Sequence, residues 1–150
     1  MNDREGLILV ADDDPNDVFL VQRAFQKINL RNPMKVVNDG QEAMAYLNGE
    51  GDFFDRGRYP LPTLLLLDLK MPRKSGFEVL DWVRRQPGLK RLVIVVLTSS
   101  NQNSDVNLAY DLGANSYLVK PAGFDNLLNL VENVQKYWLG LSEKPEVRVA

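Results

Sequence analysis

The chain has 150 residues, of which 45% are hydrophobic and 25% charged, as in a globular domain that buries a core without crosslinks. It contains no cysteine and no histidine, which excludes disulfides, thiolate metal sites, Ser-His triads and phosphohistidine chemistry. Its 18 basic and 20 acidic residues give a net charge of −2, a poor match for nucleic acid or an anionic membrane. We therefore expect a cytoplasmic protein without nucleic-acid or membrane partners, whose chemistry uses carboxylates, hydroxyls, lysines or the backbone.

Short apolar runs alternate with amphipathic stretches along the chain. The runs, each of which we predict to be a strand, cover residues 7–11, 34–37, 63–67, 92–97 and 116–119. Apart from Lys35 and the polar first residues Thr63 and Ser116, they are hydrophobic at successive positions rather than at alternate ones. This pattern is typical of strands covered on both faces, as in a parallel sheet.

The amphipathic stretches predict helices. The first begins behind Asp14, a good N-cap, and Pro15, a good first helical residue. The five predicted helices cover residues 15–28, 41–47, the stretch between Ser75 and Pro87, 105–112, and about 124–139. Five strands alternating with five helices predict a doubly wound α/β fold, with helices on both faces of a parallel sheet.

Two segments fall outside this alternation. Residues 48–62 form a long stretch rich in glycine, proline and charge, and residues 140–150 form a short tail. We expect one domain over residues 1–150, with a core of about residues 7–139. The tail is too small for an output domain.

Polar side chains follow four of the predicted strands: Asp12 with Asp13 and Asp14, Asp68, Thr98 with Ser99, and Lys120. In an open α/β sheet the carboxyl ends of the strands meet in one crevice, where ligands bind. Neighbouring carboxylates repel unless a cation compensates them, and oxygen ligands suit Mg²⁺. With Lys120 as a second positive charge and Thr98 as a hydroxyl donor, this set predicts phosphoryl transfer to Asp68.

These motifs resemble the receiver domain of two-component response regulators. The matching segments are Asp12 and Asp13 after the first strand, Asp68 in LLLLDLKMPRKSG, Thr98 in VVLTSS, and Lys120 in YLVKP. The resemblance covers roughly residues 7–139. It implies the flavodoxin-like strand order 2-1-3-4-5. It also implies that Asp68 accepts a phosphoryl group from the phosphohistidine of a sensor histidine kinase.

The resemblance also implies individual roles. Mg²⁺ would be bound by Asp12, Asp13, Asp68 and the backbone carbonyl of Lys70. Thr98 and Tyr117 would form the switch, in which Thr98 moves towards the phosphoryl group and Tyr117 turns inward. Lys70 and Ser100, two residues beyond Asp68 and Thr98, would set the lifetime of the phosphorylated state. The peptide bond between Lys120 and Pro121 would be cis.

Three features narrow the resemblance to the single-domain regulators that pair with phytochrome-type histidine kinases. These are the Asp-Asp-Asp-Pro sequence at residues 12–15, the elongated segment at residues 48–62, and the short tail in place of an output domain.

Two apolar pairs are candidate contact surfaces. Phe19 and Leu20 lie off the inward face of the first predicted helix and are candidates for kinase docking, unless neighbouring helices cover them. Leu130 and Tyr137 flank the core stripe of the last helix. They are either ordinary half-exposed residues or part of a homodimer interface.

Two other functions use related features. Haloacid-dehalogenase-like phosphatases use an Asp nucleophile with Mg²⁺, but their Asp-x-Asp motif is broken at Asp68, where Lys70 takes the second position. Asp12 and Asp14 have the right spacing, yet Asn16 replaces the expected Thr or Val. A phosphate-independent protein-binding scaffold would be favoured only if Asp68, Thr98 or Lys120 were missing.

Overall fold

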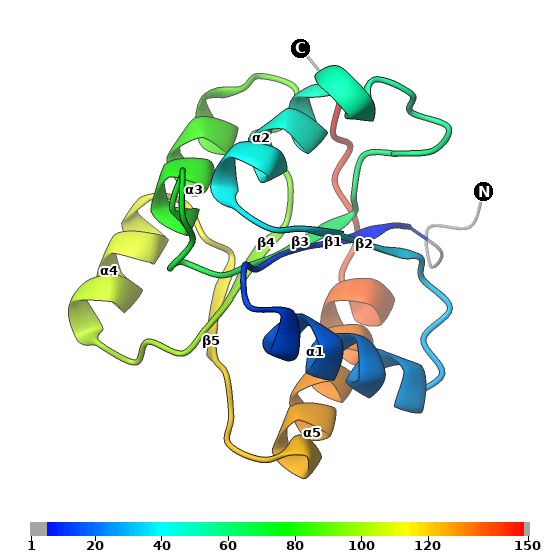
Figure 1. The fold of residues 1–150 in the computed structure, drawn as a ribbon, viewed down its shortest axis with the longest axis vertical. Coiled ribbons are helices and arrows are strands. Elements are labelled where there is room, and N and C mark those ends of the chain that lie inside the picture. Colours follow the sequence, from blue (N-terminus) through cyan, green and yellow to red (C-terminus); the bar gives the residue numbers. More distant parts are fainter. Residues whose placement is uncertain (1–5, 149–150) are drawn as a thin grey trace.

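The computed structural model describes residues 6–148, which form a five-stranded parallel sheet (Figure 1). The strand order is β2-β1-β3-β4-β5, and every neighbouring pair is parallel. The strands are β1 (Ile8–Ala11), β2 (Met34–Val37), β3 (Leu64–Leu67), β4 (Ile94–Thr98) and β5 (Ser116–Val119). The predicted fold class and strand order are confirmed.

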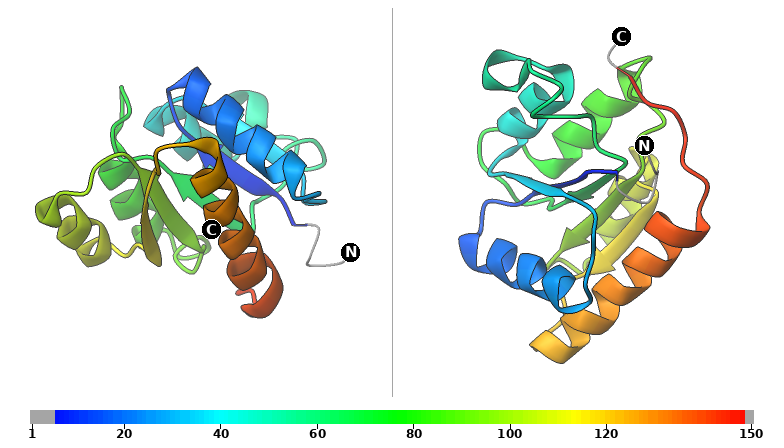
Figure 2. Two further views of the ribbon diagram at one scale, coloured as in Figure 1. Left: turned by 90° about the horizontal axis from the view of Figure 1, so that it is seen from below. Right: turned by 90° about the vertical axis from the view of Figure 1, so that its right-hand side faces the viewer.

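Helices cover both faces of the sheet (Figures 1 and 2). One face carries α1 (Pro15–Lys27) and α5 (Phe124–Val134). The other carries α2 (Gly40–Asn48), α3 (Gly76–Arg85) and α4 (Asn103–Asp111). Within residues 6–148, no helix combines the length and the hydropathy needed to cross a membrane.

The strands divide their side chains between two cores. Leu65 and Leu67 of β3 pack on the side of α2 and α3, whereas Leu64 and Leu66 pack on the side of α1 and α5. Successive side chains of a strand point to opposite faces, so a strand between two helical layers needs an apolar residue at every position. This explains the uninterrupted apolar runs.

Local side-chain caps determine where two of the helices begin. The carboxylate of Asp14 accepts the backbone N–H groups of Asn16 and Asp17, as predicted for an N-cap. Ser75 and Glu78 form a reciprocal capping box at the start of α3. By contrast, α4 begins at Asn103, two residues earlier than predicted, without a side-chain cap.

The last predicted helix differs from expectation in its final turns. The α-helix ends at Val134 and continues as a wider π-helix, η3 (Gln135–Leu141). The wider turn still buries Leu139, while Leu141 is 78% exposed.

The segment at residues 48–62 is a packed lobe that contains a short 3-10 helix, η2 (Gly51–Phe53). The guanidinium of Arg56 donates to the backbone carbonyls of Tyr46, Leu47 and Tyr59 at 2.8–3.1 Å. The rings of Tyr46, Phe53 and Tyr59 pack against one another at centroid distances of 5.1–5.9 Å. This lobe therefore extends the core on the α2 side.

The tail leaves η3 and runs along the molecule towards α3 (Figure 2). Val147 packs against the core on the α2 and α3 side, and the N–H of Arg148 donates to the carbonyl of Gly88 at 2.7 Å. Residues 149 and 150 of the predicted tail lie outside the described residues.

Candidate functional site

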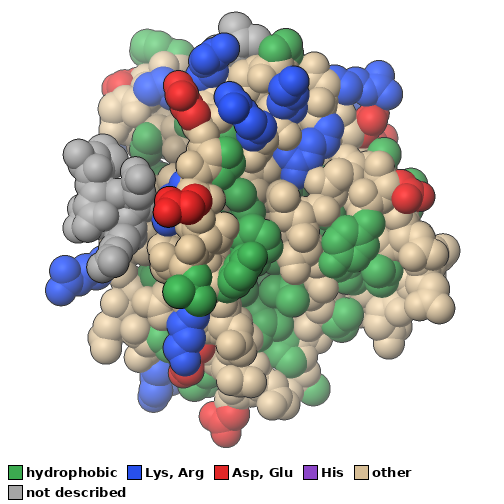
Figure 3. All heavy atoms as spheres, turned by 180° about the vertical axis from the view of Figure 1, so that it is seen from behind, with side chains coloured by type: hydrophobic (Ala, Val, Ile, Leu, Met, Phe, Trp, Pro, Cys, Tyr) green, Lys and Arg blue, Asp and Glu red, His purple; other side chains and the backbone are tan. Residues whose placement is uncertain are grey.

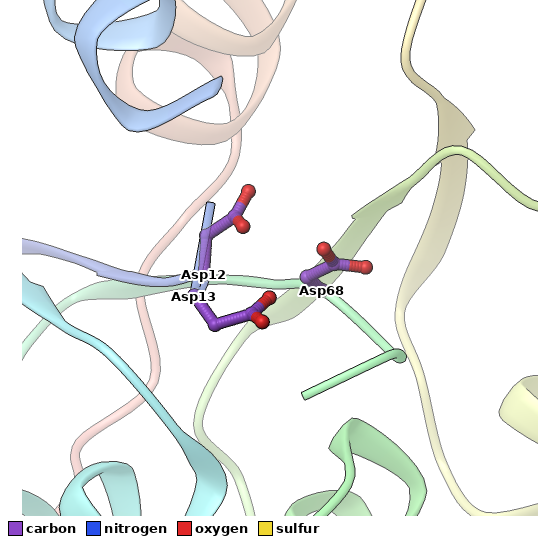
Figure 4. A group of neighbouring side chains, drawn as sticks. All are labelled: Asp12, Asp13 and Asp68. Carbon is purple, nitrogen blue, oxygen red and sulfur yellow. The ribbon is translucent and has the colours of Figure 1, made fainter. Parts of the chain in front are cut away.

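Three carboxylates meet at the carboxyl ends of β1 and β3 (Figure 4). One oxygen each of Asp12, Asp13 and Asp68 lies within 4.8 Å of the others. The N–H of Asp68 donates to the carbonyl of Ala11 at 3.0 Å, so the β1–β3 ladder fixes the backbone beneath both acids. Asp12 and Asp68 are buried, while Asp13 is exposed.

Lys120, which follows β5, places its ammonium among these acids. Its Nζ lies 2.8 Å from Oδ2 of Asp12 and 3.1 Å from Oδ2 of Asp68. A third carboxylate, that of Asp17, lies at 2.8 Å. Sequence reasoning missed Asp17, because an acidic residue in the first turn of a helix is common for reasons of the helix dipole alone. Its position five residues after Asp12, at the start of α1, was the available signal.

The surroundings shift two pKa values. Burial alone lowers the pKa of Lys120, but the hydrogen bonds with Asp12 and Asp17 and the charge of Asp68 outweigh it, so the pKa is raised. Burial raises the pKa of Asp12, although Lys120 and the N–H of Asp14 oppose that shift. The ammonium therefore stays charged at neutral pH.

Thr98 and the backbone of Lys70 complete the surroundings of Asp68. The hydroxyl of Thr98, fully buried at the end of β4, donates to Oδ1 of Asp68 at 2.8 Å. The N–H of Lys70 reaches the same oxygen at 3.3 Å. Both oxygens of Asp68 thus have donors, which a buried carboxylate requires.

Tyr117, Ser100 and Lys70 are linked by a network that the sequence did not predict. The hydroxyl of Tyr117 donates to the carbonyl of Ser100 at 2.9 Å, and the hydroxyl of Ser100 donates to Asp105 at 2.6 Å. Asp105 also pairs with Lys70 at 3.5 Å. Asp105 therefore joins the two residues assigned to phosphate lifetime, and the network ties the loop between β4 and α4 to its neighbours.

One backbone expectation is wrong. The described residues contain no cis peptide bond, so the bond between Lys120 and Pro121 is trans. The trans form is intrinsically favoured by about 0.5–1 kcal/mol even before proline. The N–H of Lys120, which donates to the carbonyl of Thr98 at 2.7 Å, holds this residue in line with β5.

The two residues predicted for kinase docking have different surroundings. Phe19 is 57% exposed on the outer side of α1, where it lines a shallow pocket with Arg23 and Lys27. Leu20 is half-buried and packs against the core on the α1 and α5 side. Of the two, Phe19 offers the larger free apolar surface.

The predicted dimer residues lie on α5 and η3. Figure 3 shows hydrophobic side chains gathered across the middle of the face opposite to that of Figure 1. Tyr137 is 53% exposed and stacks edge-on against Trp138. Leu130 is half-buried, and with both aromatics it lines a shallow pocket beside Leu118 of β5.

The donor set suits a hard divalent cation. All the ligand atoms offered by Asp12, Asp13 and Asp68 are carboxylate oxygens, which Mg²⁺ and Mn²⁺ prefer. With Asp17 the site holds four carboxylates, three of which lie within 3.1 Å of the Lys120 ammonium, so it keeps a strong negative charge.

The response regulator receiver domain family matches residues 8–132 of the chain. The chain belongs to this family. Response regulator Rcp1 of Synechocystis is 36% identical over 133 residues, which cover 89% of this chain and 88% of Rcp1. The probable methanogenesis regulatory protein FilR2 of Methanothrix harundinacea is 35% identical over 139 residues, with 93% and 87% covered.

Solved structures agree with this assignment. The phosphorylated cyanobacterial phytochrome response regulator RcpA superimposes with a TM-score of 0.88 at 35% identity, covering 95% of this chain and 99% of RcpA. The Mn²⁺-bound form of Rcp1 gives a TM-score of 0.84 at 35% identity, covering 93% and 99%. This receiver is therefore a signalling protein similar to the phytochrome-associated regulators, and neither the phosphatase nor the scaffold alternative is favoured.

Proposed function

We propose that this receiver accepts a phosphoryl group on Asp68 from a sensor histidine kinase. The observation that carries the assignment is the position of the Asp68 carboxylate. It lies beside Asp12 and Asp13, with Thr98 on one oxygen and Lys120 on the other. This arrangement brings together the nucleophile, the cation ligands and two donors for phosphoryl oxygens.

In the proposed reaction, a carboxylate oxygen of Asp68 attacks phosphorus, the P–N bond of the kinase phosphohistidine breaks, and the imidazole leaves with the electron pair. Mg²⁺, held by Asp12, Asp13, Asp68 and the carbonyl of Lys70, would neutralise charge on the phosphoryl oxygens. Lys120 donates to another phosphoryl oxygen from the position in which its ammonium already faces Asp68. The protein thus promotes its own phosphorylation and dephosphorylation.

The switch follows from the same contacts. The Thr98 hydroxyl that now donates to Asp68 would turn to a phosphoryl oxygen. The N–H of Lys120 is bonded to the carbonyl of Thr98, and the Tyr117 hydroxyl is bonded to that of Ser100. A shift at the end of β4 would therefore release Tyr117 to turn inward and change the contact surface near β5.

The proposed partners are a phytochrome-type kinase and a second copy of the chain. Similarity to RcpA and Rcp1 supports the first, and the apolar surface at Leu130 and Tyr137 supports the second. Phosphotransfer profiling against the histidine kinases of one genome should favour the phytochrome type. If Phe19 docks the kinase, Phe19→Ala slows transfer from that kinase but not from acetyl phosphate.

Incubation with acetyl phosphate tests the acceptor and the cation. With Mg²⁺ the protein should gain acid-labile phosphate, and EDTA should abolish the gain. Asp68→Asn should remove it, whereas the control Asp14→Asn, which keeps a capping side chain, should not. Phosphate uptake by Asp68→Asn at the level of the unmodified protein would overturn the assignment of Asp68. Uptake that EDTA does not reduce would show that the reaction needs no divalent cation.

A further inference from the structure

The ammonium of Lys120 has a third carboxylate partner, Asp17. Its Oδ2 lies 2.8 Å from Nζ, the same distance as Asp12 and shorter than the 3.1 Å to Asp68. The Lys120 side chain is 13% exposed and that of Asp17 is 32% exposed, so the pair lies at the mouth of the site. A largely buried ammonium needs partners of this kind.

Two of the three partners of Lys120 have a second task under the proposed function. Asp12 and Asp68 belong to the group of carboxylates that can bind a divalent cation, and Asp17 does not. A cation bound to Asp12 competes with Lys120 for that carboxylate, and a phosphoryl group on Asp68 removes another negative partner. Asp17 is the one carboxylate of the three that remains free to hold the ammonium throughout.

We infer that Asp17 is a positioning residue for Lys120, which takes up its ammonium when the divalent cation engages Asp12. This inference rests on the proposed function and deepens it. Without Asp17 the ammonium contacts only Asp12 and Asp68. It then repels the incoming cation and competes with that cation for the same two carboxylates. Loss of Asp17 therefore weakens cation binding and, through Lys120, slows phosphorylation.

Asp17 also has a structural role, since an acidic residue in the first turn of α1 complements the helix dipole. Asp14 provides a matched control for that role and for net charge. It precedes the same helix, carries the same charge and is not bonded to Lys120. Asp14→Asn and Asp17→Asn therefore remove equal charge from the same end of α1, and only the second removes the contact with the ammonium.

Titration with Mn²⁺ in the absence of any phosphoryl donor, following the free ion by electron paramagnetic resonance, tests the inference. Asp17→Asn should raise the Mn²⁺ dissociation constant about fivefold, and Asp14→Asn less than about twofold. In a Lys120→Met background the two substitutions should have equal, small effects, because the ammonium that Asp17 holds is gone. Thermal unfolding in EDTA checks folding, and Asp17→Ser serves as a second variant.

The same variants separate the inference from the proposed function. At saturating Mg²⁺, Asp17→Asn should also take up phosphoryl groups from acetyl phosphate more slowly than Asp14→Asn. If the unmodified protein takes up none, the proposed function fails, while the Mn²⁺ result still decides the role of Asp17. Equal dissociation constants for Asp17→Asn and Asp14→Asn with Lys120 present would overturn the inference. So would an equally large effect of Asp17→Asn with Lys120 absent.

Discussion

At the scale of single residues, the two carboxylate oxygens of Asp68 contact different donors. Oδ1 accepts the hydroxyl of Thr98 and the N–H of Lys70, and Oδ2 faces the ammonium of Lys120. The donors on Oδ1 come from β4 and from the loop after β3, while Lys120 follows β5. Under the proposed function, a phosphoryl group on Asp68 would redirect Thr98 and Lys120 together, which would couple the chemistry to the ends of two strands.

Lys70 should prolong the phosphorylated state. It lies two residues beyond Asp68, and Asp105 holds its ammonium. An ammonium cannot accept a hydrogen bond from an attacking water, whereas a carboxamide can. Lys70→Asn should therefore speed the loss of phosphate about threefold or more. The decay of acid-labile phosphate measures this, with the exposed Lys74→Asn as control. An unchanged or slower decay for Lys70→Asn would remove the argument.

The ion pair between Arg73 and Asp39 should make stability depend on pH. Burial alone raises the pKa of Asp39, but the N–H of Glu42 and the guanidinium of Arg73 outweigh it and lower the pKa below its ordinary 3.8. The charged form thus stabilises the fold above that value, and the contribution is lost as pH falls through the lowered pKa.

Arg73→Gln should therefore destabilise the fold at neutral pH by less than about 1 kcal/mol, because the arginine is largely exposed. The difference should shrink as pH falls below 3.8 and vanish once Asp39 is protonated in both the folded and the unfolded state. Urea unfolding at several pH values measures it. Arg85→Gln, which breaks a more exposed pair with Asp81, is the control. A loss that stays constant down to the acid limit would contradict this account of the pair.

Sequence reasoning identified Asp68, Thr98 and Lys120 because each is a polar residue that ends an apolar strand. It missed Asp17 and Asp105, which lie in the first turns of helices, where acids are ordinary. Their roles depend on which lysine the fold brings to them. Strand topology predicts that the strand ends meet. It does not predict which side chains of the neighbouring helices form hydrogen bonds or ion pairs with the residues at these ends.

At the scale of elements, the start of α3 packs directly on the strand end that carries Asp68. A Cβ at Gly76 would lie 2.3 Å from the carbonyl oxygen of Asp68 and 2.8 Å from Cα of Leu69. The N–H of Gly76 donates to the carbonyl of Leu69 at 3.0 Å. The close approach to backbone atoms requires glycine here, and it fixes the loop whose carbonyl at Lys70 is a proposed cation ligand.

Gly76→Ala should destabilise the protein by about 1–3 kcal/mol, because the added methyl group meets backbone atoms that cannot rotate away. Urea unfolding measures the loss. Gly57→Ala is the control, since a Cβ there would meet only the side chain of Asp55 at 3.2 Å. Equal stabilities of the two variants would show that the loop after β3 can shift at little energetic cost. That result would contradict the view that α3 holds the loop in place.

Most elements follow from hydrophobic periodicity, and the differences occur where tertiary contacts decide. The predicted helix over residues 124–139 becomes a π-helix after Val134, a change of hydrogen bonding that no spacing of apolar residues signals. The sequence pattern predicts neither a strand nor a helix in residues 48–62, yet Arg56 and three aromatic rings pack this segment. These contacts join residues whose pairing is absent from local sequence.

At the scale of the whole molecule, apolar surface remains where β5, α5 and η3 meet (Figure 3). Tyr137 and Leu141 are exposed there, and Leu130 lines the adjoining pocket. Tyr117, the proposed switch residue, lies on the neighbouring strand β5. We therefore expect a homodimer through this face, strengthened or rearranged by phosphorylation. Burial of this patch favours association, but the entropy lost on association offsets part of that gain. We therefore expect a dissociation constant of about micromolar order.

Sedimentation velocity with and without beryllofluoride tests the dimer. The protein should associate at tens of micromolar, on the order expected for a small patch. Tyr137→Glu should dissociate it, whereas Phe54→Glu, on the lobe at residues 48–62, should not. A protein that stays monomeric in both states would contradict the proposal. A dimer broken only by Phe54→Glu would place the interface on the lobe.

The central claim, that Asp68 receives the phosphoryl group, is tested most directly by locating the modified residue. Reduction of the phosphorylated protein with borohydride converts an aspartyl phosphate to homoserine, and mass spectrometry of peptides then identifies its position. The contacts of Thr98 and Lys120 predict homoserine at position 68 alone, dependent on Mg²⁺. Homoserine at Asp12, Asp13 or Asp17 with position 68 unmodified would contradict the account.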